Sequence, residues 1–165
     1  MTGAPAGPWS EEDARWMRQA LEEASGAGHL AEVPVGALVV HGDRCIGRGA
    51  NATEVEQDPT AHAEMLAIRQ AARFLGSRRL LGTVLYVTLE PCAMCAGAIV
   101  LARIPRLVFG AHDPRSGACG SLRNLVQDPR LNHRCQVSGG VLAEECGAQL
   151  RSFFAGLRTP GRPQE

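Results

Sequence analysis

The sequence predicts an α/β layered domain with a mixed β-sheet. Short apolar runs typical of buried strands alternate along the chain with stretches whose apolar residues recur at helical spacing. The length of 165 residues suits one domain with a substantial core. We therefore expect one domain over 10–158, after a loose Pro/Gly-rich segment over 1–9 and before a short tail over 159–165.

The first helix is predicted to begin after Ser10, because serine is a favoured N-cap and three acidic residues follow it in the first turn. Either Gly26 or Gly28 is expected to end this helix. Its apolar face consists of Trp16, Met17, Ala20, Leu21 and Ala24.

A β-hairpin is predicted next. The run 34–40 is almost entirely apolar, residues 42–43 are a Gly-Asp turn signal, and 44–50 form the returning strand. A polar loop over 51–59 is then expected to lead into a second helix over 61–69.

The second half of the chain continues the alternation of strands and helices. The expected elements are a strand over 83–88, a helix over 93–100, a strand over 106–110, helix-like turns from Ser121, a short strand over 135–137 and a helix over 141–157. The last helix is amphipathic. Its apolar side consists of Leu142, Cys146, Leu150, Phe153, Phe154 and Leu157.

The charge of the chain excludes a strongly basic protein, because 17 arginines balance 17 acidic residues. The average hides an asymmetry: residues 1–32 carry six acids and two arginines, whereas residues 101–165 carry nine arginines and five acids. A basic C-terminal third could bind a phosphate backbone, or it could be an ordinary solvated surface. Charge alone does not choose between these readings.

No apolar run approaches the roughly 18 residues of a membrane span, so we expect no membrane partner. The N-terminus has neither the basic residues nor the apolar core of a secretory signal, and we expect a cytoplasmic protein. In such a compartment, six cysteines favour thiols and a metal site over disulfides.

Two short motifs thirty residues apart predict a hydrolytic zinc site: His62-x-Glu64 and Cys92-x-x-Cys95. One imidazole and two thiolates are one ligand short of a closed structural site, so the fourth position stays free for water. Cys92 and Cys95 share one face at a helix start, where free amides and the helix dipole stabilise thiolates. His62 and Glu64 are expected in the first turn of another helix, and two facing helix starts would bring all four groups together.

The chemistry that this site predicts is deamination of a heteroaromatic ring. Zinc lowers the pKa of bound water from about 15.7 towards roughly 7. Glu64 would take a proton from that water and pass it to the leaving nitrogen, so that oxygen replaces the amino group and ammonia leaves. A His/Cys/Cys ligand set beside a non-ligand glutamate is the known signature of zinc deaminases.

Other readings of these motifs compete with the catalytic one. A lone Cys-x-x-Cys pair can be a redox pair or half of a structural zinc site. A structural site would need a fourth ligand, and none of the other cysteines has a second ligand at close spacing. We expect all of them to be small buried hydrophobic residues: Cys45, Cys119, Cys135 and Cys146.

From about Ser10 to Arg158, the chain resembles the bacterial tRNA-specific adenosine deaminases. The segments that carry the resemblance are, in order, EVPVGA (32–37), DPTAHAE (58–64), TLEPCAMCAGA (88–98), VFGA (108–111), NH (132–133) and FF (153–154). The resemblance implies a three-layer α/β/α cytidine-deaminase-like fold, with a five-stranded mixed sheet flanked by helices. It also implies conversion of the wobble adenosine to inosine in the arginine tRNA whose anticodon starts with A. A homodimer whose two subunits both touch the anticodon stem-loop is implied as well.

The same resemblance implies the role of each site residue. His62, Cys92 and Cys95 match the ligands of one Zn²⁺ per subunit, and Glu64 matches the proton shuttle. The implied substrate contacts are Val33, Pro34, Asn51, Ala63, Asp113, Asn132, Phe154 and Arg158.

The roles implied for these substrate contacts differ. Asn51 matches an asparagine that contacts the target nucleotide, although asparagine also favours a turn after a strand. The backbone of Ala63 should face the base, and Val33 and Pro34 resemble a pocket wall or core residues at a strand start. Asp113 matches an acid of the anticodon-loop contact region. Positions near the flanking nucleotides are matched by Asn132, Phe154 and Arg158, and Phe154 has an alternative role in the core.

Two other functions stay open. A zinc deaminase acting on a free base or nucleoside, such as guanine, cytosine or cytidine, is not excluded by the core motifs, although the C-terminal segments 132–133 and 153–158 favour the RNA-acting branch. A non-catalytic partner subunit would keep the metal but commonly replaces the shuttle carboxylate. Glu64 is present here, which counts against that function.

Overall fold

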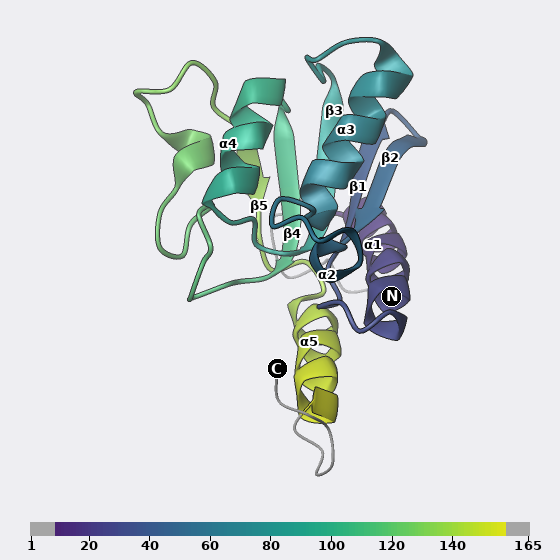
Figure 1. Cartoon of the computed structure of the whole chain (residues 1–165). Helices are drawn as coiled ribbons and strands as arrows, with labels where there is room; N and C mark the ends of the chain where they lie inside the picture. Colours follow the sequence, from purple (N-terminus) through teal and green to yellow (C-terminus); the bar gives the residue numbers. More distant parts are fainter. Residues whose placement is uncertain (1–8, 158–165) are drawn as a thin grey trace.

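The computed structural model describes residues 9–157, which form a five-stranded sheet with helices on both faces (Figure 1). The strands are β1 Gly36–His41, β2 Arg44–Ala50, β3 Thr83–Leu89, β4 Arg106–Ala111 and β5 Gln136–Ser138. The helices are α1 Glu11–His29, α2 Thr53–Glu56, α3 Ala63–Leu75, α4 Ala93–Ala102, the 3-10 helix η1 Leu125–Gln127, and α5 Ala143–Leu157. The predicted fold class is confirmed. Arg158, the tail over 159–165 and all of the segment 1–9 except Trp9 lie outside the described residues.

The sheet is mixed, with the strand order β2-β1-β3-β4-β5. Strand β1 is antiparallel to both β2 and β3, whereas β3, β4 and β5 run parallel to one another. Because parallel strands end at the same edge of a sheet, the residues that follow β3 and β4 meet there. This edge carries the candidate site.

Two separate cores lie on the two faces of the sheet, because successive side chains of a strand point to opposite sides. Leu85 and Val87 of β3 belong to the core beneath α3 and α4, whereas Tyr86 between them packs with Trp16 and Met17 of α1. Figure 1 shows α3 and α4 together on one face and α1 on the other. These are the three predicted layers.

Helix α1 begins as predicted, with a reciprocal capping box. The amide of Asp13 donates to Oγ of Ser10 at 3.1 Å, and the amide of Ser10 donates to Oδ2 of Asp13 at 3.0 Å. The predicted end at Gly26 or Gly28 is wrong, since the helix continues to His29. Burial of Ala27 on the inner face offsets the roughly 1 kcal/mol by which glycine disfavours a helix.

The buried carboxylate of Asp13 also ties α1 to the sheet. Its two oxygens accept hydrogen bonds from the two terminal nitrogens of Arg106 on β4, each at 2.8 Å, and Oδ1 accepts a third from the hydroxyl of Tyr86 on β3 at 2.9 Å. Burial alone would raise the pKa of Asp13, but these bonds and the one from Ser10 outweigh it and hold the pKa below its usual value. The aspartate is therefore ionised and fully partnered.

Two glycines of β2 allow α3 to lie directly on that strand. A Cβ at Gly47 would overlap the carbonyl oxygen of Ala67, and a Cβ at Gly49 would overlap that of Ala63. Close backbone approach of this kind needs glycine. The position of the start of α3, and of the residues that begin it, depends on these two contacts.

The loop predicted over 51–59 contains the short helix α2, so that part of the prediction is wrong. The cause is a long-range contact. The buried carboxylate of Glu32 accepts a hydrogen bond from the amide of Val55 at 2.6 Å, which satisfies one of the first amides of α2.

The apolar side predicted for α5 is only partly buried. Cys146 is the one buried residue of this helix, whereas Phe154 and Leu157 are 42% and 41% exposed. Figure 1 shows why, because α5 extends past the end of the sheet. Among the helices of the described residues, none combines the length and the apolar character that crossing a bilayer needs.

Candidate active site

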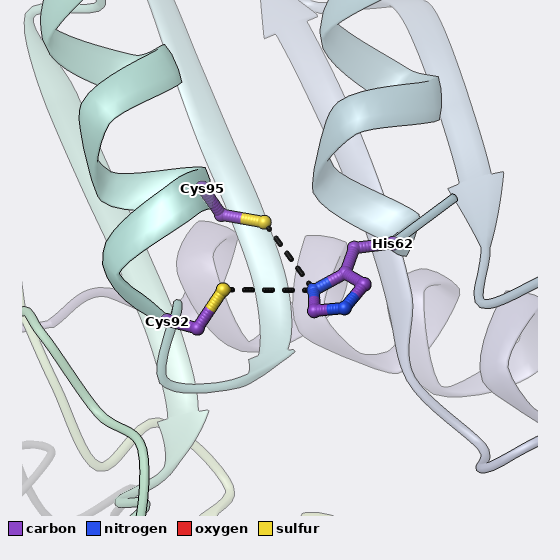
Figure 2. A group of neighbouring side chains, drawn as sticks. All are labelled: His62, Cys92 and Cys95. Atoms are coloured by element: carbon purple, nitrogen blue, oxygen red, sulfur yellow. Dashed lines mark hydrogen bonds between the residues drawn. The ribbon is translucent and has the colours of Figure 1, made fainter. Parts of the chain in front are cut away.

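The starts of α3 and α4 face each other at the edge where β3 ends (Figure 2). His62 is the N-cap residue of α3 and Cys92 is the N-cap residue of α4, and neither side chain caps its own helix. Figure 2 shows that His62 instead points across the gap toward Cys92 and Cys95. The sequence placed His62 in the first turn, whereas it precedes that turn by one residue.

The three side chains have the spacing of a metal site. Each sulfur, Sγ of Cys92 and Sγ of Cys95, lies 3.6 Å from Nδ1 of His62. Zinc–sulfur bonds of about 2.3 Å and zinc–nitrogen bonds of about 2.0–2.1 Å, arranged tetrahedrally, would separate sulfur and nitrogen by roughly 3.5 Å. The three residues therefore fit a zinc ion. No other group of three or more candidate ligands occurs within residues 9–157.

The electrostatics of the group also suit a cation. Hydrogen bonds from Cys95 and His62 lower the pKa of Cys92 to about 3, so this residue is a thiolate at neutral pH. The hydrogen bond to Cys92, together with burial, raises the pKa of Cys95. The pKa of His62 is raised chiefly by its hydrogen bond with Cys92. Metal binding would displace the remaining protons, as it does at other thiolate sites.

Glu64 lies in the first turn of α3 and is 4% exposed. Burial raises the pKa of its carboxyl group to about 7, and the nearby His62 only partly opposes this rise. Its Oε2 atom is buried and has no hydrogen-bond partner among the described residues. A carboxyl group with a pKa near neutrality can both accept and return a proton, which suits general acid–base catalysis.

A cavity of about 340 Å³ opens above these groups. Small-molecule sites commonly begin at about 300 Å³, so the cavity suits a ligand no larger than one nucleobase with part of its sugar. It is lined by Val33, Val35, Asn51, Thr53, His62, Ala63, Glu64, Leu89, Glu90, Cys92, Asp113 and Ser116.

Four of the eight expected substrate contacts line this cavity: Val33, Asn51, Ala63 and Asp113. Pro34 is buried beside it without lining it, and Asn132 and Phe154 are exposed on the surface outside it. The structure thus brings Val33, Asn51, Ala63 and Asp113 together around the cavity and leaves Asn132 and Phe154 apart from it.

Sequence reasoning missed the role of Glu90, which lies between β3 and the cysteine motif and is 2% exposed. Its carboxylate accepts hydrogen bonds from the amides of Asp113, Cys119 and Ser121 at 3.0, 3.2 and 3.0 Å, and from the hydroxyl of Ser121. The loop after β4, which supplies one wall of the cavity, is therefore fixed by the residue two positions before Cys92. An acid directly after an apolar strand was the available signal.

The conformation of that loop depends on two further features. A Cβ at Gly117 would overlap the carboxylate of Glu90, so glycine is required there. The side chain of Asp113 accepts hydrogen bonds from the amides of Arg115 and Ser116 at 3.0 and 3.2 Å, an Asx-type turn. Asp113 therefore shapes the wall as well as lining it.

The remaining cysteines lie outside the metal group. Cys119, Cys135 and Cys146 are buried, as predicted for small hydrophobic residues. Cys45 is only half-buried, so the prediction is wrong there, because β2 is an edge strand and its outer residues are incompletely covered.

Sequence comparisons connect the chain to known deaminases. Residues 11–155 match the model of the MafB19-like deaminase family. A tRNA-specific adenosine deaminase of Bacillus subtilis is 51% identical over 147 residues, which cover 89% of this chain and 91% of that protein. One of Haemophilus influenzae is 53% identical over 146 residues, which cover 88% of this chain and 84% of that protein.

Structural comparisons agree. A solved structure from a study of A-to-I editing by tRNA deaminases at the wobble position of transfer RNA matches with a TM-score of 0.79 and 46% identity, covering 82% of this chain and 98% of that one. A guanine deaminase from Nitrosomonas europaea matches with a TM-score of 0.75, covering 93% of this chain and 89% of that one. At 22% identity, the second likeness concerns the fold alone.

Proposed function

Because this chain belongs to the MafB19-like deaminase family, and relatives that are 51% and 53% identical to it are tRNA-specific adenosine deaminases, we propose that it deaminates adenosine to inosine in tRNA. The observation that carries the proposal is the group of His62, Cys92 and Cys95 beside the buried carboxyl of Glu64, at a cavity sized for one base. The presence of Glu64 argues against a non-catalytic partner subunit, which would have no need of a buried carboxyl there.

The metal of this site is proposed to be zinc, with one ion per chain. Two sulfur donors and one imidazole favour zinc over magnesium or calcium, which prefer oxygen ligands. The sulfur–nitrogen separations of 3.6 Å support the same ion. When bound, zinc would supply the Lewis acidity that makes a water molecule nucleophilic at neutral pH.

The chain's own catalytic residue in this proposal is Glu64. Its Oε2 atom takes a proton from the attacking water and later gives a proton to the departing nitrogen. Burial raises the pKa of this carboxyl group above its ordinary value, which favours its role as a proton acceptor and donor. Burial in the first turn of α3 keeps the carboxyl group fixed in one place between these steps.

The proposed substrate is the wobble adenosine of a tRNA anticodon, with the arginine tRNA expected. Unpaired loop bases can be turned out of the stack at little cost, and a cavity of about 340 Å³ suits one such base. The amide group of Asn51 is available to bind the nucleotide, and Val33 offers an apolar wall. Ala63 begins α3, so its amide has no partner within the helix and is free for the base.

The remaining proposed contacts concern the rest of the anticodon loop. Asp113 is on the loop that walls the cavity, so it is suited to a nucleotide next to the flipped one. Asn132 and Phe154 are exposed outside the cavity and are proposed to contact flanking nucleotides, as is Arg158. Pro34 is proposed to support the pocket wall from behind Val33.

A homodimer is the proposed assembly. Helix α4 is apolar around its whole circumference, and such helices are usually buried on all sides. Its outer side is nevertheless uncovered within one chain, where Leu101 is 73% exposed. A second copy covering α4 would explain this composition. We also propose a cytoplasmic location, where a tRNA substrate is available.

The experiment that tests the function is inosine formation in an arginine tRNA anticodon stem-loop, with the same loop carrying guanosine at the wobble position as control. Free adenosine, adenine, guanine and cytidine are assayed in parallel, and zinc content is read from the same preparation. The proposal predicts inosine in the adenosine loop only, with about one zinc per chain. Fast turnover of a free base or nucleoside without turnover of the stem-loop would overturn the tRNA assignment.

A further inference from the structure

A second, shallow and open concave surface lies between β2 and the C-terminal half of α3, with a volume of about 530 Å³. Arg44 and Arg48 of β2 contribute to it from one side, and Arg73 and Phe74 of α3 contribute from the other. We call it the β2–α3 hollow. It shares no lining residue with the catalytic cavity.

The lining of the hollow includes three arginines and no acidic residue. Residues 65–89, which include most of α3, contain four arginines and no acidic residue. Within the part of the chain that the structure describes, no carboxylate lies within 4.0 Å of the guanidinium of Arg44 or Arg73. Arg48 is paired with Glu23 at 3.1 Å. Arg78 and Arg79 are exposed just after the end of α3 and add to the same field.

An exposed aromatic ring accompanies these charges. The guanidinium carbon of Arg44 lies 4.6 Å from the centre of the Phe74 ring, and Phe74 is 50% exposed. Stacking on an aromatic ring holds the guanidinium plane in place and leaves its edge donors free for phosphate oxygens. Unpaired arginines beside an exposed aromatic ring are characteristic of surfaces that bind RNA.

The hollow and the catalytic cavity lie at the two ends of the same pair of elements. The cavity is lined by Asn51 just after β2 and by Glu64 at the start of α3, whereas the hollow is lined by the start of β2 and by Arg73. Arg73 lies nine positions beyond Glu64 on the helix, which is about 14 Å along the axis. At roughly 3.4 Å of duplex axis per phosphate of one strand, this distance matches on the order of four phosphates of a stem.

We infer that the β2–α3 hollow binds the phosphate backbone of the same tRNA whose base enters the cavity, beyond the anticodon loop. The inference rests on the proposed tRNA function and adds a contact that holds the stem while the base reacts. It accounts for a concentration of unpaired arginines in a chain whose formal net charge is zero.

The test compares two double variants of the full chain in its zinc-loaded form. Arg44→Gln with Arg73→Gln removes the two unpaired charges of the hollow. Arg15→Gln with Arg18→Gln removes two exposed arginines from α1, on the other face of the sheet, and is the matched control. Binding of arginine tRNA is measured over a range of salt concentrations in a Glu64→Ala background, so that the substrate is not consumed. Deamination kinetics are measured with Glu64 intact.

The hollow variant should bind tRNA more weakly than the wild type. In a plot of log affinity against log salt concentration, the slope of this variant should be smaller in magnitude by about 1.4–1.8, as expected for two lost phosphate contacts. Its kcat at saturating tRNA should stay unchanged, and the control should keep the wild-type salt slope. A wild-type slope in the hollow variant overturns the inference. So does a change of oligomeric state without a change in slope, which would mark the hollow as a subunit contact. Absence of inosine with wild-type protein would instead refute the proposed function itself.

Discussion

The carboxylate of Glu90 accepts a hydrogen bond from the backbone amide of Asp113 at 3.0 Å, and this contact joins the cysteine motif to the opposite wall of the cavity. Glu90 leads into the helix that supplies Cys92 and Cys95, whereas Asp113 belongs to the loop after β4. The candidate metal ligands and the wall that would face the substrate are therefore held in register by one buried side chain.

Replacing this carboxylate tests its positioning role. Glu90→Gln keeps the size of the side chain but has one oxygen where the loop amides need two acceptors. We expect zinc to be retained and the KM for the stem-loop to rise about tenfold, which corresponds to roughly 1.4 kcal/mol, with a smaller change in kcat. The exposed Glu144→Gln is the control, with unchanged kinetics. A variant that loses zinc and kcat together would show that Glu90 supports the metal site and not the wall.

Removal of the proposed proton shuttle should separate metal binding from chemistry. Because Glu64 is not a member of the ligand group, Glu64→Ala should keep about one zinc per chain while kcat falls by about 10²–10⁴. Zinc by metal analysis and inosine by chromatography of the digested stem-loop are the two readouts. Substantial deamination by this variant would contradict the role given to Glu64.

Loss of a metal ligand should affect stability as well as activity. Cys95→Ala is expected to lose zinc and to lower the Tm clearly, because metal binding contributes free energy to folding. Cys45→Ala is the matched control, since Cys45 is a half-buried cysteine outside the metal group. Thermal unfolding with and without a chelator checks the comparison. Equal chelator sensitivity in the Cys95 variant and the wild type would argue that Cys95 is not a ligand.

The sequence predicted that His62, Cys92 and Cys95 lie close together, because the geometry of this group is mostly local. Cys92 and Cys95 must share a face when a helix begins between them, and His62 directly precedes the neighbouring helix of the same layer. Most strands were equally predictable, since a buried strand such as β3 is a short, almost continuous apolar run.

Other features depend on side chains that reach far along the chain, and no local pattern reports them. The contacts of Glu90 join residues 23 to 31 positions apart. Likewise, α2 is fixed by Glu32, which is 23 positions from Val55. The apolar side of α5 followed from its periodicity, yet only the three-dimensional structure shows that α5 extends past the sheet. Phe154 on this helix is 42% exposed.

The ion pair between Asp13 and Arg106 predicts how stability depends on pH. The pKa of Asp13 is lower in the folded protein than in the unfolded chain, so the folded state binds fewer protons at mildly acidic pH. Its contribution to stability should be fully present above the unfolded value of about 3.9 and should disappear as the pH falls through the lower folded value. Asp13→Asn should therefore lower the free energy of unfolding at pH 7 by about 2 kcal/mol, and by progressively less below pH 4.

Urea unfolding of wild type and variant across this pH range measures the difference directly. Glu12→Gln is the control, because Glu12 and its partner Arg15 are both more than half exposed, and such surface pairs contribute little. If the difference in free energy of unfolding between Asp13→Asn and the wild type stayed constant from pH 7 to below pH 4, the charge of Asp13 would not contribute to stability. A difference that shrinks with acid would show that the ionised carboxylate, held by Arg106 and Tyr86, anchors α1 to the sheet.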